Sequence, residues 1–188
     1  MCCGEADWSA APKLSPRNPK RGSVSLMSTS PATASPAAAR LFEAVATVAS
    51  KSGVFGPVEV KKTPLMLVCE AKNSAEPAQY RLFEEGGKLW VSLVTDNRWL
   101  SQSIEAQLFH SGDKLEELLD EELYDVGYEG ATLPFEHFRS ADMLYTFRSP
   151  LPIGASAPDA AGIASKCLLA YEACFRRLGD MDAADEED

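Results

Sequence analysis

The residue types in this 188-residue chain that most often carry catalysis or hold metals are its two histidines and five cysteines. A metal site needs His, Cys or carboxylate ligands that converge, but His110 and His137 form no close pair such as H-x-x-x-H. A nucleophilic Cys/His pair needs a cysteine beside a histidine. Cys69, Cys167 and Cys174 instead fall in apolar patterns that predict buried thiols. The sequence therefore predicts no catalytic residue, no metal site and no cofactor.

A second interpretation of the same residues stays open. In it, a small-molecule-binding or enzymatic site lies around His110, Asp113 and His137, in a concave apolar pocket with convergent polar groups. The chain contains neither G-x-S-x-G nor G-x-x-x-x-G-K-[ST], so no sequence motif indicates a nucleophilic serine or a phosphate-binding loop.

Carboxylates are abundant in one short stretch of the chain. Acid/base catalysis requires two carboxylates whose pKa values differ, in a site that excludes water. A consecutive run on one helix face is instead typical of a solvated surface, and it could also bind a basic segment of a partner protein. The run comprises Glu116, Glu117, Asp120, Glu121 and Glu122.

The Arg98-Trp99 pair is the most distinctive combination of a polar and an aromatic residue. Trp and Arg are enriched among the residues that dominate protein–protein binding. In the alternative interpretation, Trp99 packs against the edge of the core and Arg98 stacks outside it. Trp90, Arg98 and Trp99 are the candidate partner-binding residues.

The charge distribution excludes several classes of partner. The formal net charge is −10, and residues 180–188 carry six acidic residues and no basic one. An acidic protein repels phosphate backbones and anionic lipid surfaces, so we expect it to bind neither nucleic acid nor membranes. The odd number of cysteines and the absence of C-x-x-C fit a reducing compartment, which predicts a cytoplasmic protein.

The two ends of the sequence differ from the middle in composition. Residues 1–36 are rich in Ser, Pro and Ala, with no acidic residue after Asp7, and residues 179–188 form an acidic tail. Both segments are predicted to be disordered. The acid-poor leader also resembles an organelle transit peptide, and Met27 is an alternative start to Met1. The remaining residues, 37–178, are predicted to form one domain.

Strand patterns occupy the first half of this domain. The clearest is a hairpin in which Tyr80 to Glu84 and Lys88 to Thr95 flank a turn at Glu85-Gly86-Gly87. In its second arm Leu89, Val91, Leu93 and Thr95 point to one side, and Trp90, Ser92 and Val94 to the other. Further strands are predicted at residues 58–62, 65–71 and 143–148.

Three segments have helical patterns. Ser35 is a plausible N-cap, Pro36 suits the first helical position and Gly53 suits the residue after the helix. A second helix is predicted from a cap at Ser111 or Asp113, and a third from residue 158 to 178. Residues 133–140 are predicted to be a loop.

Residues 99–109 fit two structures. As a helix they place Trp99, Leu100 and Ile104 on one side, and as a strand they alternate strictly between apolar and polar residues. The alternation favours a third strand beside the hairpin. The order of elements then predicts an α+β fold, with a mainly antiparallel sheet of four to six strands packed with three helices.

This layout resembles the type III secretion chaperone-like fold, and within it the bacterial YbjN-type family, described as sensory transduction regulators. The resemblance rests on the hairpin from Tyr80 to Thr95 with its Leu-Trp-Val-Ser-Leu arm, the turn Asp96-Asn97-Arg98-Trp99, and the helix that follows Ser111-Gly112-Asp113-Lys114. It covers roughly residues 37–178. It implies a non-enzymatic domain that binds protein segments, often as a dimer.

The first functional hypothesis is therefore a non-enzymatic protein-interaction or regulatory domain of chaperone-like fold. Its partner would be an extended or helical protein segment, which the acidic helix would favour if the segment is basic. A third hypothesis is a domain that assembles into a homodimer through an exposed sheet.

Overall fold

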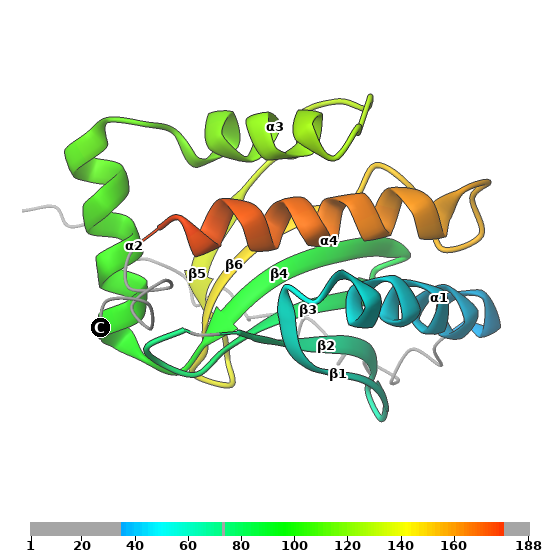
Figure 1. The fold of residues 1–188 in the computed structure, drawn as a ribbon. Helices are drawn as coiled ribbons and strands as arrows, with labels where there is room; N and C mark the ends of the chain where they lie inside the picture. Colours follow the sequence, from blue (N-terminus) through cyan, green and yellow to red (C-terminus); the bar gives the residue numbers. More distant parts are fainter. Residues whose placement is uncertain (1–34, 73, 179–188) are drawn as a thin grey trace, which may run out of the picture. The chain divides into compact units, whose positions relative to one another are not determined.

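The computed structural model describes residues 35–72 and 74–178. Within these ranges four helices and a six-stranded antiparallel sheet form the α+β fold that the sequence predicts (Figure 1). The elements are α1 (Pro36–Ser52), β1 (Phe55–Lys62), β2 (Leu65–Ala71), β3 (Ala78–Glu85), β4 (Lys88–Thr95), α2 (Arg98–Ser111), α3 (Leu115–Asp125), β5 (Glu136–Arg139), β6 (Tyr145–Pro150) and α4 (Ala160–Arg176). The expectations for the leader and the acidic tail concern residues that lie almost wholly outside these ranges.

The sheet has the strand order β1-β2-β3-β4-β6-β5, and every neighbouring pair is antiparallel. The first four strands form a meander in chain order. α2 and α3 then intervene before β5 and β6, and β6 pairs with β4. The chain therefore returns to the sheet beside the predicted hairpin, so β4 is an inner strand.

Local chemistry explains the first helix and the hairpin, both of which are confirmed. The Ser35 hydroxyl accepts a hydrogen bond from the Ala38 N–H at 3.1 Å, and Gly53 follows α1 with φ of 74°. Between β3 and β4, Gly86 and Gly87 both have positive φ, at 60° and 75°. A tight hairpin turn of this hand requires that conformation, which glycine adopts without a steric penalty.

The core lies between the sheet and helices α1 and α4, and buried side chains of α2 and α3 extend it. α1 and α4 cover one face of the sheet (Figure 1). Alternate residues of the inner strands point to this face, and the buried ones pack against the helices. Phe147 of β6 packs edge-on against Phe175 of α4, with ring centroids 5.4 Å apart. The Tyr171 and Ser149 hydroxyls share a buried hydrogen bond of 2.8 Å. No described helix covers the opposite sheet face, which we call the open face.

The prediction of a strand at residues 99–109 is wrong, because this segment is helix α2. Asn97 caps it: its Oδ1 accepts from the Trp99 N–H at 2.7 Å and the Leu100 N–H at 3.1 Å. Gly112 ends it in the left-handed conformation, with φ of 77°. Leu100 and Ile104, which are four residues apart, are its buried apolar side chains. The caps override the alternation of apolar residues, and the described chain has four helices instead of three.

Three smaller expectations also need correction. The N-cap of α3 is Lys114, so neither Ser111 nor Asp113 caps that helix. The predicted loop at 133–140 contains the short edge strand β5. The last strand begins at Tyr145 because Met143, with φ of 65°, belongs to the preceding turn and donates its N–H to the Ser140 carbonyl at 3.0 Å.

Candidate functional site

One row of side chains crosses the open face from strand to strand. The strand register places directly opposite residues on the same side of the sheet. In order across the sheet, the row consists of Glu59, Val68, Arg81, Ser92, Arg148 and Glu136. Two arginines therefore flank a serine at the centre of the open face.

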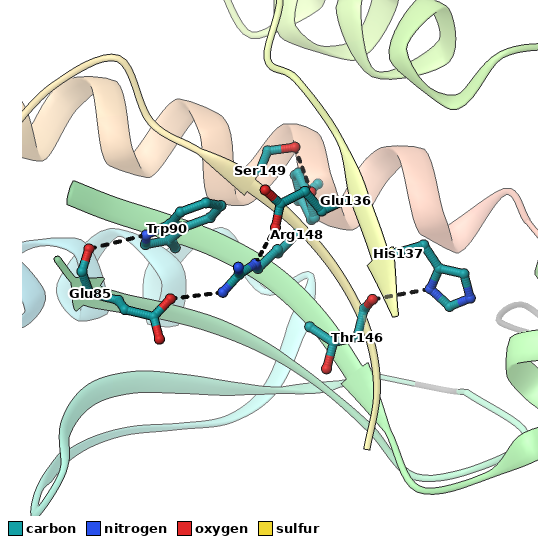
Figure 2. A network of polar contacts seen from close by, with 8 residues as sticks. Glu85, Trp90, Glu136, His137, Thr146, Arg148 and Ser149 are labelled. Carbon is teal, nitrogen blue, oxygen red and sulfur yellow. Dashed lines mark hydrogen bonds and ion pairs between the residues drawn. The ribbon is translucent and has the colours of Figure 1, made fainter. Parts of the chain in front are cut away.

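Arg148 is held by both charge and stacking. Its guanidinium pairs with Glu85 at 2.9 Å and with Glu136 at 2.8 Å (Figure 2). The same group lies over the Trp90 ring, 4.1 Å from its centroid, and 4.8 Å from the centroid of Phe138. The Trp90 Nε1–H in turn donates to the Glu85 carbonyl at 3.4 Å. The charge of Arg148 is thus balanced by two carboxylates within the chain.

Arg81 has a different environment. Its Nε and Nη2 donate to the amide oxygen of Gln79 at 3.2 and 2.8 Å, and it forms no ion pair within the described residues. Burial lowers the pKa of the Arg81 guanidinium from its ordinary value, and the negative charge of Asp142 partly opposes that shift. Arg81 is therefore a half-buried cation that feels the charge of Asp142 but forms no ion pair among the described residues.

Ser92 lies between the two arginines and is fully buried, with 0% of its surface exposed. Its Oγ has no hydrogen-bond partner among the described residues. Leaving a buried hydroxyl without a partner costs about 1–3 kcal/mol. The site therefore contains an unused hydrogen-bond donor beside a cation.

A groove of about 490 Å³ opens over this part of the row. Arg81, Ser92 and Arg148 line it together with the carboxylates of Glu84, Glu85 and Asp142, and so do the apolar side chains Met66, Phe83, Val94, Leu144 and Phe138. A second hollow of about 510 Å³, towards the other end of β4, shares Arg81, Val94 and Leu144 with it. The two hollows are thus adjacent, and Arg81 lies at their junction.

The three predicted partner-binding residues do not form one cluster. Trp90 lies on the open face, in contact with Arg148. Arg98 and Trp99 begin α2, beyond the other end of β4, and 74% of the Trp99 surface is exposed. The interpretation in which Trp99 packs against the core edge is therefore wrong. Partner binding by Arg98 and Trp99 stays a prediction.

The alternative site around His110, Asp113 and His137 is not assembled. The His110 Nδ1 lies 2.7 Å from the Ala106 carbonyl of its own helix. Asp113 lines a small hollow of about 110 Å³ between α2, α3 and the end of α4. No hydrogen bond or ion pair joins any two of the three residues in the part of the chain that the structure describes.

His137 instead connects two elements. Its ring stacks on Phe147 with centroids 3.9 Å apart, and its Nδ1 lies 3.0 Å from the Thr146 carbonyl (Figure 2). Its Nε2 lies 2.9 Å from a Glu105 carboxylate oxygen on α2. The contacts of His137 hold α2 against the β5 edge of the sheet, which is a structural role.

The predicted burial of the three cysteines is confirmed. Cys69, Cys167 and Cys174 are buried and free, and burial raises the pKa of each thiol from its ordinary 9.0 to about 12. Among the described residues, no three His, Cys, Asp or Glu side chains are grouped so as to hold a metal ion. In the same ranges, no helix is long and apolar enough to cross a membrane.

Sequence reasoning missed the Arg81–Ser92–Arg148 cluster. The alternation along β4 does place Ser92 on the same side as Trp90 and Val94. The one signal in the sequence was a serine in the middle of an otherwise apolar inner strand. The two arginines could not be assigned to it without the strand order.

Comparisons of this chain with protein-family models, with curated proteins and with solved structures find no significant match.

Proposed function

We propose that this chain is a non-enzymatic protein-interaction or regulatory domain, which binds an extended segment of a partner protein in the groove of the open face. The observation that carries the proposal is the groove itself. It combines apolar side chains with Arg81 and Ser92, whose charge and hydroxyl have no close partner within the described chain. Aromatic and arginine side chains of this kind dominate the energetics of protein–protein binding.

The groove is a better site for a segment than the acidic face of α3. On α3, Glu117 pairs with Lys114 at 2.8 Å and Glu122 pairs with Arg177 at 2.7 Å. A basic partner would have to exchange these ion pairs for new ones. Because a surface ion pair contributes only about 0–1 kcal/mol, this exchange would add little binding free energy. The groove offers buried apolar area as well, which contributes more per contact.

Arg98 and Trp99 would be reached by a longer segment. Asp96, two residues before Arg98, lines the hollow that adjoins the groove at Arg81. A segment that continues through this hollow would pass the start of α2, where Trp99 is exposed. This arrangement would give Arg98 and Trp99 a secondary role at the end of the groove.

A displayed library of random twelve-residue peptides tests the proposal. Selection against the wild-type protein is expected to enrich binders, and Ala141→Trp is expected to weaken them at least tenfold. Ala141 is exposed and lines the groove, so a tryptophan there fills the groove with little strain. Ala106→Trp, at an exposed position of α2, is the matched control and should leave binding unchanged.

Two results would contradict the proposal. One is a selection that enriches no peptide. The other is a set of binders that tolerate Ala141→Trp, because they would occupy another surface. A second copy of this chain is the other candidate occupant of the groove. Analytical ultracentrifugation at the same protein concentration tests for such a dimer. A dimer that Ala141→Trp dissociates would mean that the groove serves self-assembly instead of partner binding.

A further inference from the structure

We infer that the groove selects partner segments by a carboxylate: an acidic residue flanked, two positions away on each side, by apolar residues. The inference rests on the proposed function and names the chemistry of its partner. Apolar area is not the only feature of the groove that could select a ligand. A cation and an unused hydroxyl donor lie together at its centre, on Arg81 and Ser92.

Charge selects the ligand group. Glu85 and Glu136 form ion pairs with Arg148, whereas Arg81 hydrogen-bonds to the neutral amide of Gln79 and feels the charge of Asp142 without forming an ion pair with it. An incoming anion would therefore gain more electrostatic free energy at Arg81 than at Arg148. Gln79 accepts from Nε and Nη2, which leaves the two hydrogens of Nη1 and one hydrogen of Nη2 for a ligand. A carboxylate matches this planar fork of donors.

Ser92 is an independent observation that points to the same ligand. It lies directly opposite Arg81 in the register, it is fully buried, and it lines the groove with its hydroxyl unpartnered. A hydroxyl hydrogen bonded to a charged acceptor forms one of the stronger hydrogen bonds in proteins. One carboxylate would thus accept hydrogen bonds from both side chains, and the Ser92 hydroxyl would gain the partner that it lacks within the described chain.

The rows on either side of the arginine row set the apolar positions. Phe83 and Trp90 form the next row in one direction, and Gln79 and Val94 the next row in the other. Same-face residues in a strand are about 6.6 Å apart, and so are residues i and i+2 of an extended ligand. An extended segment that runs along the axes of β3 and β4 therefore places its acidic residue over Arg81. Its flanking apolar residues then lie over Phe83 and Val94.

Two synthetic peptides test the inference on the full-length protein. One has a single glutamate flanked two residues away on each side by leucine, and the other has glutamine in place of the glutamate. In ¹H–¹⁵N NMR titrations at low salt, the glutamate peptide is expected to bind about tenfold more tightly, as removal of one charged hydrogen-bonded contact predicts. The amides of β3 and β4 around Arg81 and Ser92 should shift.

Variants of the protein locate the preference. Arg81→Gln is expected to make the two peptides bind equally, and Ser92→Ala to reduce the preference severalfold. Arg40→Gln, an exposed arginine on α1, removes the same charge elsewhere and should leave the preference intact. The comparison of the two peptides on the wild-type protein needs no variant, so it stands even if Arg81→Gln unfolds.

The outcomes separate this inference from the proposed function. Equal binding of both peptides, abolished by Ala141→Trp, would overturn the carboxylate preference and leave segment binding in the groove intact. A preference for glutamate that survives Arg81→Gln would also overturn the inference. If neither peptide shifts the amides of β3 and β4 at millimolar concentration, the inference fails, and the library selection alone decides the proposed function.

Discussion

At the scale of single residues, the sheet contains two buried serines on neighbouring strands, one on each face, with opposite environments. Ser149 of β6 shares a hydrogen bond of 2.8 Å with Tyr171, on the helix-covered side. Ser92 of β4 is equally buried, on the open side, and its hydroxyl has no partner. The first hydroxyl contributes to the fold, and the second opposes it. A group that opposes folding is a candidate for binding, because a ligand can supply what the fold does not.

The pair of serines gives a prediction with an internal control. Ser92→Ala removes a hydroxyl that nothing satisfies, so the free energy of unfolding should stay the same or rise by up to about 1 kcal/mol. Ser149→Ala leaves the buried Tyr171 hydroxyl without a partner and should lower it by about 1–3 kcal/mol. Urea unfolding followed by circular dichroism measures both. A loss of stability in Ser92→Ala equal to that in Ser149→Ala would show that Ser92 is already satisfied.

Arg148 gives a second prediction at this scale. Arg148→Met removes the ion pairs to Glu85 and Glu136 and the cation–π contacts to Trp90 and Phe138. The Arg148 side chain is only 20% exposed, so solvent screens these interactions less than on the surface. We expect a loss of about 1–3 kcal/mol in the free energy of unfolding.

The control for Arg148 is an exposed pair. Lys114→Met breaks the exposed ion pair with Glu117 and should produce no measurable change. If Arg148→Met is equally silent in the same urea titration, the network of Figure 2 does not stabilise the fold.

At the scale of elements, α2 shows how end signals decide between two periodicities. Its sequence alternates like a strand, yet Asn97 and Gly112 cap it as a helix. α1 and the β3–β4 hairpin could be predicted because their signals are local: a capping serine, and two glycines in a turn. The Arg81–Ser92–Arg148 cluster could not, because it depends on β6 pairing with β4 across α2 and α3. No local pattern encodes that choice of neighbour.

The cap of α2 can be tested directly. Asn97→Ala removes the acceptor of the Trp99 and Leu100 N–H groups and should destabilise the protein by about 1 kcal/mol. Asn97→Asp keeps an oxygen acceptor at the same place and should restore most of that loss. Hydrogen exchange of the α2 amides should accelerate in Asn97→Ala only. Unchanged exchange in that variant would mean that the contacts of α2, and not its cap, determine its stability.

At the scale of the whole described unit, the two faces of one sheet differ in what covers them and in composition. α1 and α4 cover one face and form the core with it, and this core contains three thiols. The other face keeps a groove with charged residues at its centre. The core of the unit therefore lies mainly on one side of the sheet, so the fold constrains the composition of the other side less. Buried thiols make the covered side sensitive to alkaline pH in a way that can be measured.

The sign of this pH dependence follows from the pKa values. Burial raises the pKa of Cys69, Cys167 and Cys174 from 9.0 to about 12, because the thiolate is poorly solvated in the core. Their contribution to stability is complete below pH 9. It is lost as the pH rises from about 9 towards 12, since the unfolded chain releases protons that the native state keeps. Each thiol lowers the free energy of unfolding by up to about 1.4 kcal/mol per pH unit in this window.

Comparison with Cys174→Ala isolates this effect from the titration of tyrosines and lysines, which both proteins share. The variant loses some stability at every pH through the missing sulfur, so the informative quantity is the slope. Between pH 9 and 10.5, the free energy of unfolding of the variant should fall less steeply than that of the wild type, by about 1 kcal/mol per pH unit. Parallel slopes in urea titrations would mean that the Cys174 thiol ionises at the same pH in the folded and unfolded states. In that case its site between α4 and α3 would be open to water, and the covered side would not be the sealed core described above.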